Sequence, residues 1–147
     1  MPVRVYRVCR AIHAALDGAG ARKAGGRWNS RGKAVVYMAE SVSLAVLENL
    51  VHMSRQDYPL GYVMVAVAIP DDVPIESDEA LRTAGPRLGP RMFGDRWIDS
   101  LASAVLKVRS AVVPAEHNYL LNPAHRDFAK FVAELPEPFQ FDGRLFK

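Results

Sequence analysis

Three polar side chains in the first third of the chain stand where their neighbours are apolar or sharply turning. Arg27 follows Gly25 and Gly26, Tyr37 lies inside the apolar run Ala-Val-Val-Tyr-Met, and Glu48 lies within Leu-Ala-Val-Leu-Glu-Asn-Leu-Val. A guanidinium can hold an anion, a tyrosine ring can stack on a flat ligand, and a carboxylate can stabilise a developing positive charge. Together they predict much of an active site.

Glu48 carries most of this prediction. It lies within the stripe formed by Leu44, Leu47 and Val51 on a predicted helix. A carboxylate on an apolar helix face is unfavourable unless something pairs with it. Two structural explanations stand beside a catalytic one: an ion pair with Arg27, or a helix rotated so that Glu48 points to solvent.

Ser110 is a further candidate, inside a predicted strand among valines. No base is placed by spacing to activate it, so we expect a polar contact and not a nucleophile. Taken singly, each candidate also has an ordinary structural role, as a core aromatic, a turn residue or a solvated cation. Weaker candidates for lining the pocket are Arg7, Trp28, Asn29 and Asn118.

Composition bounds the class of protein. The 147 residues are 50% apolar and 24% charged, as in a globular domain, and we expect one domain over residues 1–147. The sequence contains no run of 18 apolar residues, so we expect no membrane span. Cys9 is the only cysteine, which fits a reducing cytoplasm. The net charge is +3, and the Lys and Arg residues are scattered along the chain, which does not favour direct DNA binding.

Several familiar motifs fail. The segment Gly26 to Lys33 has five residues between its glycines, and Ala34 follows the lysine where a phosphate loop needs Ser or Thr. Gly18-Ala-Gly20 lacks the third glycine of a dinucleotide fingerprint. The four histidines and the cysteine have no metal-ligand spacing, so we expect no metal.

The patterns of apolar residues predict an α+β fold with a partly antiparallel sheet core and flanking short helices. The predicted strands are Pro2–Val8, Ala34–Met38, Leu60–Ile69 (a central strand buried on both faces), Ala104–Val113 and Pro138–Phe146. The predicted helices are Ala11–Leu16, Ser41–Ser54, Asp95–Ser103 and Asp127–Glu134. Between them we expect a structured loop over 21–33, an irregular segment over 71–94 with one helical turn near Glu79, and turns over 118–123.

The candidates occur together in an order that resembles the RES-domain family. The matching segments are Gly-Gly-Arg-Trp-Asn-x-x-Gly, Val-Val-Tyr, Leu-Ala-x-Leu-Glu and Ser-Ala-Val-Val-Pro-x-x-x-Asn-Tyr-Leu-Leu-Asn-Pro-x-His-x-Asp-Phe. The arginine, glutamate and serine that give the family its name fall on Arg27, Glu48 and Ser110. The chain departs from the family where Val108-Arg109-Ser110 replaces the usual Val-Pro-Ser.

The resemblance implies a split, ADP-ribosyltransferase-like fold and an NAD⁺-consuming toxin of a bacterial type II toxin–antitoxin pair. Such a toxin depletes cellular NAD⁺ and arrests growth. The implied partner is an Xre-type helix-turn-helix antitoxin that blocks the active site, and a homodimer within the complex is a further expectation. Phe139 and Phe141 are candidates for either contact, or for the core.

Cleavage of the nicotinamide–ribose bond suits these residues. Nicotinamide leaves as a neutral base, so the acid that glycosidases need is not required, and one carboxylate can stabilise the oxocarbenium ion. We expect Glu48 in that role, Tyr37 stacked on the nicotinamide ring, and Arg27 on the pyrophosphate or ribose. Ser110 is expected to contact the substrate or Glu48.

Alternatives remain open at this point. The ADP-ribose could pass to water, to phosphate or to a protein target. A ribonuclease-like or other RNA-directed toxin is motivated by the positive charge, and its RNA binding would depend on salt. A non-catalytic module with a degenerate pocket is the last alternative.

Overall fold

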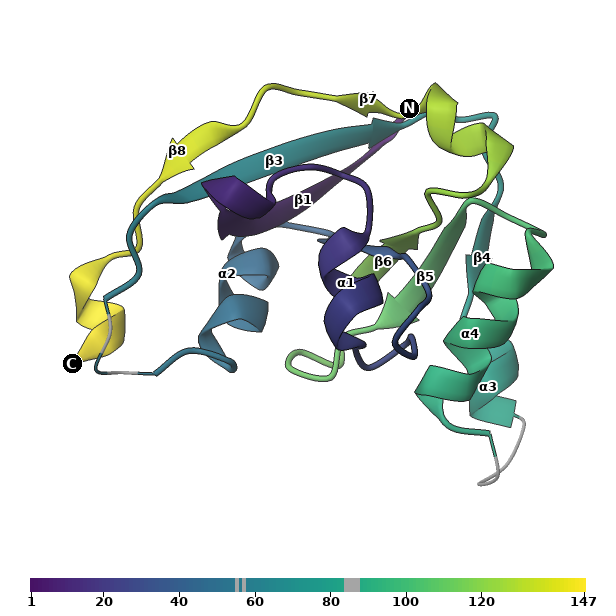
Figure 1. Ribbon diagram of the computed structural model, residues 1–147, viewed down its shortest axis with the longest axis horizontal. Coiled ribbons are helices and arrows are strands. Elements are labelled where there is room, and N and C mark those ends of the chain that lie inside the picture. Colours follow the sequence, from purple (N-terminus) through teal and green to yellow (C-terminus); the bar gives the residue numbers. More distant parts are fainter. Residues whose placement is uncertain (55, 57, 84–87) are drawn as a thin grey trace.

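The computed structural model describes residues 1–54, 56, 58–83 and 88–147, and these form an α+β fold, which confirms the predicted class (Figure 1). The strands are β1 (Val3–Arg10), β2 (Val36–Ala39), β3 (Tyr62–Ile69), β4 (Ile75–Ser77), β5 (Val105–Arg109), β6 (His117–Leu121), β7 (Val132–Ala133) and β8 (Glu137–Phe139). The α-helices are α1 (Ala19–Ala24), α2 (Val42–Leu50), α3 (Glu79–Thr83) and α4 (Pro90–Ser100). Short 3-10 helices are η1 (Ala11–His13), η2 (Arg126–Lys130) and η3 (Gly143–Phe146).

The strands pair in the order β4-β5-β6-β2-β1-β3-β7, with β8 beside β3. Only β4 and β5 run parallel, and the other pairs are antiparallel, as the predicted mixed sheet requires. β1 pairs with β3 along its whole length but meets β2 at the single register pair Tyr6↔Ala39. The sheet therefore almost divides between β1 and β2, and this seam is where the expected split lies.

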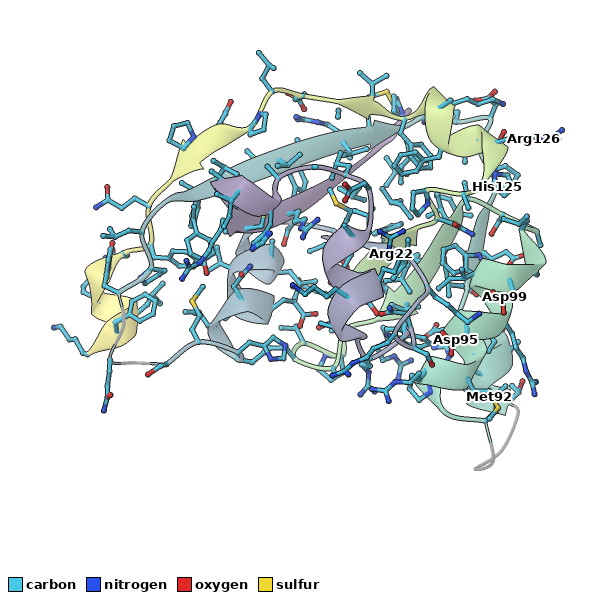
Figure 2. All side chains as sticks on the ribbon, in the orientation of Figure 1. Arg22, Met92, Asp95, Asp99, His125 and Arg126 are labelled. Atoms are coloured by element: carbon cyan, nitrogen blue, oxygen red, sulfur yellow. The ribbon has the colours of Figure 1, made fainter. Side chains whose placement is uncertain are left out.

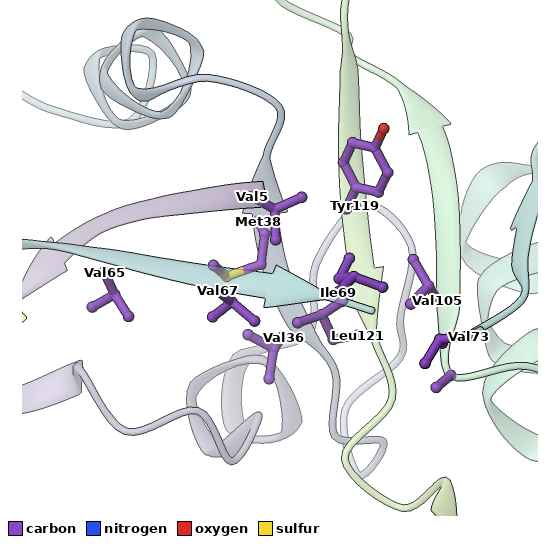
Figure 3. Close-up of a cluster of buried hydrophobic side chains, with 11 residues drawn as sticks. Val5, Val36, Met38, Val65, Val67, Ile69, Val73, Val105, Tyr119 and Leu121 are labelled. Atoms are coloured by element: carbon purple, nitrogen blue, oxygen red, sulfur yellow. The ribbon is translucent and has the colours of Figure 1, made fainter. Parts of the chain in front are cut away.

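Apolar side chains from both parts of the sheet meet in a common core (Figure 3). Val5 and Val67 come from one side of the seam, and Val36 and Leu121 come from the other, and each is fully buried. A further cluster packs α2 against β1 around Leu44 and Phe141. Phe141 is thus a core residue and not a surface for a partner, which settles one of the alternatives left by the sequence.

Helix α2 begins where the sequence predicts, because the Ser41 side chain accepts a hydrogen bond from the N–H of Leu44 at 3.1 Å. The predicted apolar stripe is wrong in part. Leu44 is 1% exposed, but Leu47 and Val51 are 40% and 55% exposed. The helix packs Leu44 and Ala45 on the sheet instead, which turns the side of Glu48 toward a cavity and not into the core.

Two errors concern the strands that carry late site residues. The predicted strand Ala104–Val113 ends at Arg109, because the Ser110 hydroxyl accepts hydrogen bonds from the N–H groups of Val112 and Val113 and turns the chain. The predicted turn over 118–123 is strand β6 as far as Leu121, paired with β2 and β5. One neighbour, β5, directly precedes β6 in the chain, but the other, β2, comes from a distant part of the sequence, which the local asparagine pattern does not reveal.

Other boundaries also differ from prediction. β3 lies near one edge of the sheet and not at its centre. The predicted loop over 21–33 begins as α1, the expected first helix is only η1, and α4 begins at Pro90 instead of Asp95. The irregular segment over 71–94 contains β4 as well as the expected helical turn, and its residues 84–87 lie outside the described part. The last predicted helix, Asp127–Glu134, corresponds to η2 followed by β7. The last predicted strand, Pro138–Phe146, corresponds to β8 followed by η3.

No helix in the described ranges is both long and apolar enough to cross a membrane.

Candidate active site

A cavity of about 1100 Å³ lies at the seam between β1 and β2, bounded also by α1 and the second half of α2. Six of the eight predicted site residues line it: Arg7, Arg27, Trp28, Tyr37, Glu48 and Asn118. Six charged side chains line the cavity: Arg7, Arg10, Arg27, Arg109, Asp17 and Glu48. The four arginines outnumber the two carboxylates, which leaves an excess positive charge of two. Such a lining suits an anionic ligand that also carries a positive charge at one position, beside a carboxylate of the lining.

Glu48 is the acidic side chain at the end of this cavity where α2 faces the late strands. Its Oε2 accepts a hydrogen bond from the Ser110 hydroxyl at 3.2 Å and another from the Asn118 side-chain N–H. Within the described chain, no donor reaches Oε1 and no cation forms an ion pair with Glu48, Arg27 included. One carboxylate oxygen is therefore held, while the other is left for a ligand.

Ser110 is 1% exposed and lies just behind the cavity wall. Its oxygen already accepts the N–H groups of Val112 at 3.1 Å and Val113 at 3.0 Å while its hydroxyl donates to Glu48. Both lone pairs are thus used, so the hydroxyl is a poor nucleophile in this arrangement. Its position fits a group that orients the carboxylate.

Asn118 orients the same carboxylate from β6. Its Oδ1 is buried, and it has no hydrogen-bond partner among the residues that the structure describes. Reversal of the amide would leave the N–H₂ group without a partner and turn Oδ1 toward the Glu48 carboxylate, two acceptors facing each other. The amide is therefore fixed with its donors toward Glu48.

Tyr37 connects the cavity to residues 25–33, which we call the arginine loop. Its hydroxyl donates to Asn29 Oδ1 at 2.6 Å and accepts the N–H of Trp28 at 3.1 Å. Burial raises the pKa of the Tyr37 phenol to about 12. Because the hydroxyl is bound to the loop, the part of the side chain available to a ligand is the ring.

The glycines before Arg27, which could let the backbone approach a ligand closely, instead allow a close approach within the protein. A Cβ on Gly26 would lie 2.7 Å from the Tyr37 hydroxyl, so the close approach is to this tyrosine and not to a ligand. Gly25 has a φ of 72°, a conformation that favours glycine. Arg27 itself is exposed at the tip of a turn closed by the bridge between Gly26 and Asn29.

Asn29 lies outside the cavity wall and is fully buried. Its Nδ2 donates to the carbonyl oxygens of Ala21 at 2.8 Å and Lys33 at 3.0 Å. The structure therefore places Asn29 where it shapes the arginine loop. Trp28 is 5% exposed and packs edge-on against Phe93 with ring centroids 6.3 Å apart, so it is mainly a core residue at the cavity margin.

Helix α4 holds the arginine loop from behind, a role that the sequence did not reveal. Asp95 accepts the N–H of Ser30 at 2.8 Å, and Arg91 Nε donates to the carbonyl of Gly26 at 3.3 Å. A Cβ on Gly94 would lie 1.8 Å from the carbonyl oxygen of Trp28. Figure 2 shows Asp95 on α4 beside this loop. No local pattern in the sequence links these two segments.

Sequence reasoning also missed several polar residues that line the cavity, Asn49, Cys9 and His52 among them. The Asn49 side chain donates to the carbonyl oxygens of Val8 at 2.7 Å and Ala45 at 2.8 Å, which fixes α2 to β1. Cys9 is 8% exposed, and burial raises the pKa of its thiol. His52, beyond the end of α2, lies at the same cavity.

Within the described ranges, no group of three or more His, Cys, Asp or Glu side chains is arranged to hold a metal ion.

Comparison with known proteins adds independent information. The family model described as the RES domain matches residues 4–142. The chain is 37% identical to "Prs ADP-ribosylating toxin" of Sphingobium over 141 residues, 90% of this chain and 87% of that protein. It is 35% identical to "Toxin Res" of Photorhabdus laumondii, with 97% of each chain covered.

Among solved structures, the M. tuberculosis MbcT–MbcA toxin–antitoxin complex contains a chain of the same fold. The TM-score is 0.73 at 16% identity, and the match covers 99% of this chain and 87% of that one. The matched segment of the family model includes the seam, the arginine loop and the residues around Glu48. The chain belongs to the RES domain family.

Proposed function

We propose that this chain is the toxin of a bacterial toxin–antitoxin pair and that it cleaves the nicotinamide–ribose bond of NAD⁺. The observation that carries the proposal is Glu48, a carboxylate without an ion-pair partner in the described chain, fixed through Oε2 with Oε1 left for a ligand. The names of two relatives, an ADP-ribosylating toxin and a toxin, support it.

The reaction needs stabilisation of positive charge at the ribose. As the C–N bond breaks, its electron pair goes to nicotinamide and the ribose becomes an oxocarbenium ion. Glu48 Oε1 stabilises that cation, and it does so without reorganisation because Ser110 and Asn118 already hold Oε2. Neither of these two residues takes part in a bond that changes.

The remaining residues bind and orient the dinucleotide. The Tyr37 ring stacks on nicotinamide, because its hydroxyl is engaged with the arginine loop. Arg27 and Arg7 line the same cavity and supply guanidinium donors for the pyrophosphate or ribose. NAD⁺ is thus a substrate, and no residue of this mechanism requires a metal.

A second candidate function is transfer of ADP-ribose to a protein. The relative named as a Prs ADP-ribosylating toxin favours it. The chemistry at Glu48 is the same for water, phosphate or a protein acceptor, because the acceptor attacks after positive charge has developed. The products, and not the position of Glu48, separate these reactions.

The proposal includes an antitoxin that blocks the cavity, supported by the toxin–antitoxin complex whose toxin-like chain shares this fold. We propose an Xre-type helix-turn-helix protein for this partner. A homodimer within the complex and a cytoplasmic location stay predictions.

The test is to incubate the purified chain, free of antitoxin, with NAD⁺ and to follow nicotinamide and ADP-ribose products by mass, with and without inorganic phosphate. Glu48→Gln should lower turnover by about 10²–10³-fold, since it removes the charge that stabilises the transition state. Glu76→Gln, at an exposed position of β4, is the matched control and should retain activity. Equal turnover by Glu48→Gln and the wild type would overturn the assignment.

A further inference from the structure

A second cavity, of about 350 Å³, adjoins the first on the other side of Ser110. The two share Arg27, Trp28, Arg109 and Ala111 in their walls. The second cavity is completed by Leu81 and Arg82 of α3, by Pro90 at the start of α4, and by Asp78, Ser110 and Pro114. It therefore lies close to the carboxylate that Ser110 holds, but Glu48 is not in its wall.

The walls of this second cavity carry an excess of positive charge. Three guanidinium groups, those of Arg27, Arg82 and Arg109, line it together with one carboxylate, that of Asp78. Within the described ranges, none of these three guanidinium groups forms an ion pair with a carboxylate. Like charges gathered around one cavity repel each other, and an anion between them removes that repulsion.

The parallel pairing of β4 with β5 brings these groups together. β4 runs parallel to β5 from Ile75↔Val105 to Ser77↔Lys107, so α3, which follows β4, lies beside the end of β5. The backbone N–H of Arg109 donates to Asp78 Oδ2 at 3.0 Å, and Asp78 is 5% exposed. A proline at position 109 has no N–H for this bond. The arginine at this position thus adds both a hydrogen bond and a cation.

We propose that the second cavity binds a phosphoryl anion between Arg27, Arg82 and Arg109. Guanidinium groups match phosphate oxygens through paired N–H donors, and several donors on one anion give charge-assisted hydrogen bonds. The anion is either the pyrophosphate of a dinucleotide that enters the first cavity or a separate phosphate ion. The place of this site in the reaction rests on the proposed function, whereas the anion binding itself rests on the three arginines.

The experiment uses the full chain, free of antitoxin and NAD⁺, and measures binding of inorganic phosphate by calorimetry and by the shift of the melting temperature. Arg82→Ala should weaken phosphate binding by about tenfold, as expected for loss of one charge-assisted contact. Arg82→Gln, which keeps most of the side-chain length, should weaken it similarly. Arg126→Ala is the control, because Arg126 lies at another side of the molecule (Figure 2) and should leave binding unchanged.

A second measurement separates the two sources of the anion. If ADP-ribose prevents phosphate binding, the site takes the pyrophosphate of the dinucleotide. If phosphate binds as before to the ADP-ribose complex, the site takes a separate anion. Glu48→Gln should bind phosphate like the wild type, so failure of the NAD⁺ assay leaves this test intact. Absence of phosphate binding by the wild type, or binding by both Arg82 variants as tight as that of the wild type, would overturn the proposal.

Discussion

The two sides of the large cavity are built in different ways. On one side, the arginine loop is fixed mainly through its backbone: Asn29 binds three carbonyl groups, Asp95 binds the N–H of Ser30, and the Tyr37 hydroxyl binds the N–H of Trp28. On the other side, two side chains that donate to one oxygen are all that holds Glu48 within the described residues. The loop that carries Arg27 is thus held by the same backbone contacts that hold the fold together. The position of the Glu48 carboxylate depends instead on two side-chain hydrogen bonds.

This difference has a consequence for mutation. Changes behind the arginine loop should lower the stability of the whole domain, because buried backbone groups lose their partners. Changes around Glu48 should lower turnover more than stability, because the network lies at a cavity and can be solvated. The following predictions break or sharpen that contrast, from the largest expected effect to the smallest.

Gly94→Ala should have the largest effect on stability. The new Cβ would lie 1.8 Å from the Trp28 carbonyl oxygen, a backbone atom, so α4 must move away from the arginine loop. We expect a loss of about 3 kcal/mol in the free energy of unfolding, measured with urea. Gly20→Ala is the matched control: nothing lies within 4 Å of its Cβ, and alanine favours helix α1. A Gly94→Ala variant as stable as the wild type would contradict the close packing.

Tyr37→Phe keeps the ring but removes the hydroxyl, which leaves the Trp28 N–H and Asn29 Oδ1 without this partner. The expected loss is about 2 kcal/mol in the free energy of unfolding. Tyr62→Phe is the control, since its ring packs against Phe141 and no hydrogen bond of its hydroxyl occurs in the described part of the chain. If both variants were equally stable, the Tyr37 hydroxyl would not support the loop.

The same tyrosine predicts a dependence on pH. Burial raises the pKa of Tyr37 from 10.0 to about 12, so the folded state holds this proton more tightly than the unfolded state. The stability that the neutral phenol contributes is complete below pH 10.0 and is lost as the pH rises to about 12. Unfolding of the wild type and Tyr37→Phe across this range should show a steeper decline for the wild type, and parallel curves would refute the assignment.

Asn118→Ala should affect turnover more than stability. Without the Asn118 side-chain N–H, the Glu48 carboxylate keeps the Ser110 hydrogen bond alone and is less well oriented. We therefore expect kcat to fall about tenfold while KM changes little. Asn118→Asp places a second carboxylate beside Glu48, which raises the pKa of one of the pair and moves the pH–rate profile to higher pH. A purely structural role for Asn118 would leave that profile where it is.

Asp99→Ala should have the smallest effect. Nζ of Lys33, the last residue of the arginine loop, lies 2.7 Å from Asp99 Oδ1, but the Asp99 side chain is 61% exposed. Exposed ion pairs contribute little because water screens them. We expect no measurable change in the urea midpoint or in NAD⁺ turnover. A clear loss of stability would show that the loop depends on surface charge as well as on its buried bonds.

The sequence was informative where a local pattern decides the outcome. The Ser41 cap and the apolar residues that follow it predict α2, and the apolar run before Pro70 predicts β3. Patterns failed where a distant partner decides. β6 was mistaken for turns because Asn118 and Asn122 are typical of turns, whereas its strand conformation follows from pairing with β2 and β5.

The candidate site shows the same division. Glu48 and Tyr37 stand out because a polar residue interrupts an apolar pattern, and both line the cavity. Asn29 looks like a ligand contact in the sequence, yet its buried amide binds the backbone of its own loop and of α1. The contact between Gly94 and the Trp28 carbonyl depends on how α4 docks, and no spacing in the sequence predicts it.

The order of the strands also affects when the site comes into being during translation. Glu48 is held by side chains that lie 62 and 70 residues later in the chain, and β2 has β6 as a neighbour. A nascent chain that has folded α2 but has not yet emerged as far as Ser110 carries the carboxylate without either group that orients it. For a protein proposed to be a toxin, the ribosome therefore makes most of the chain before any activity can harm the cell that makes it.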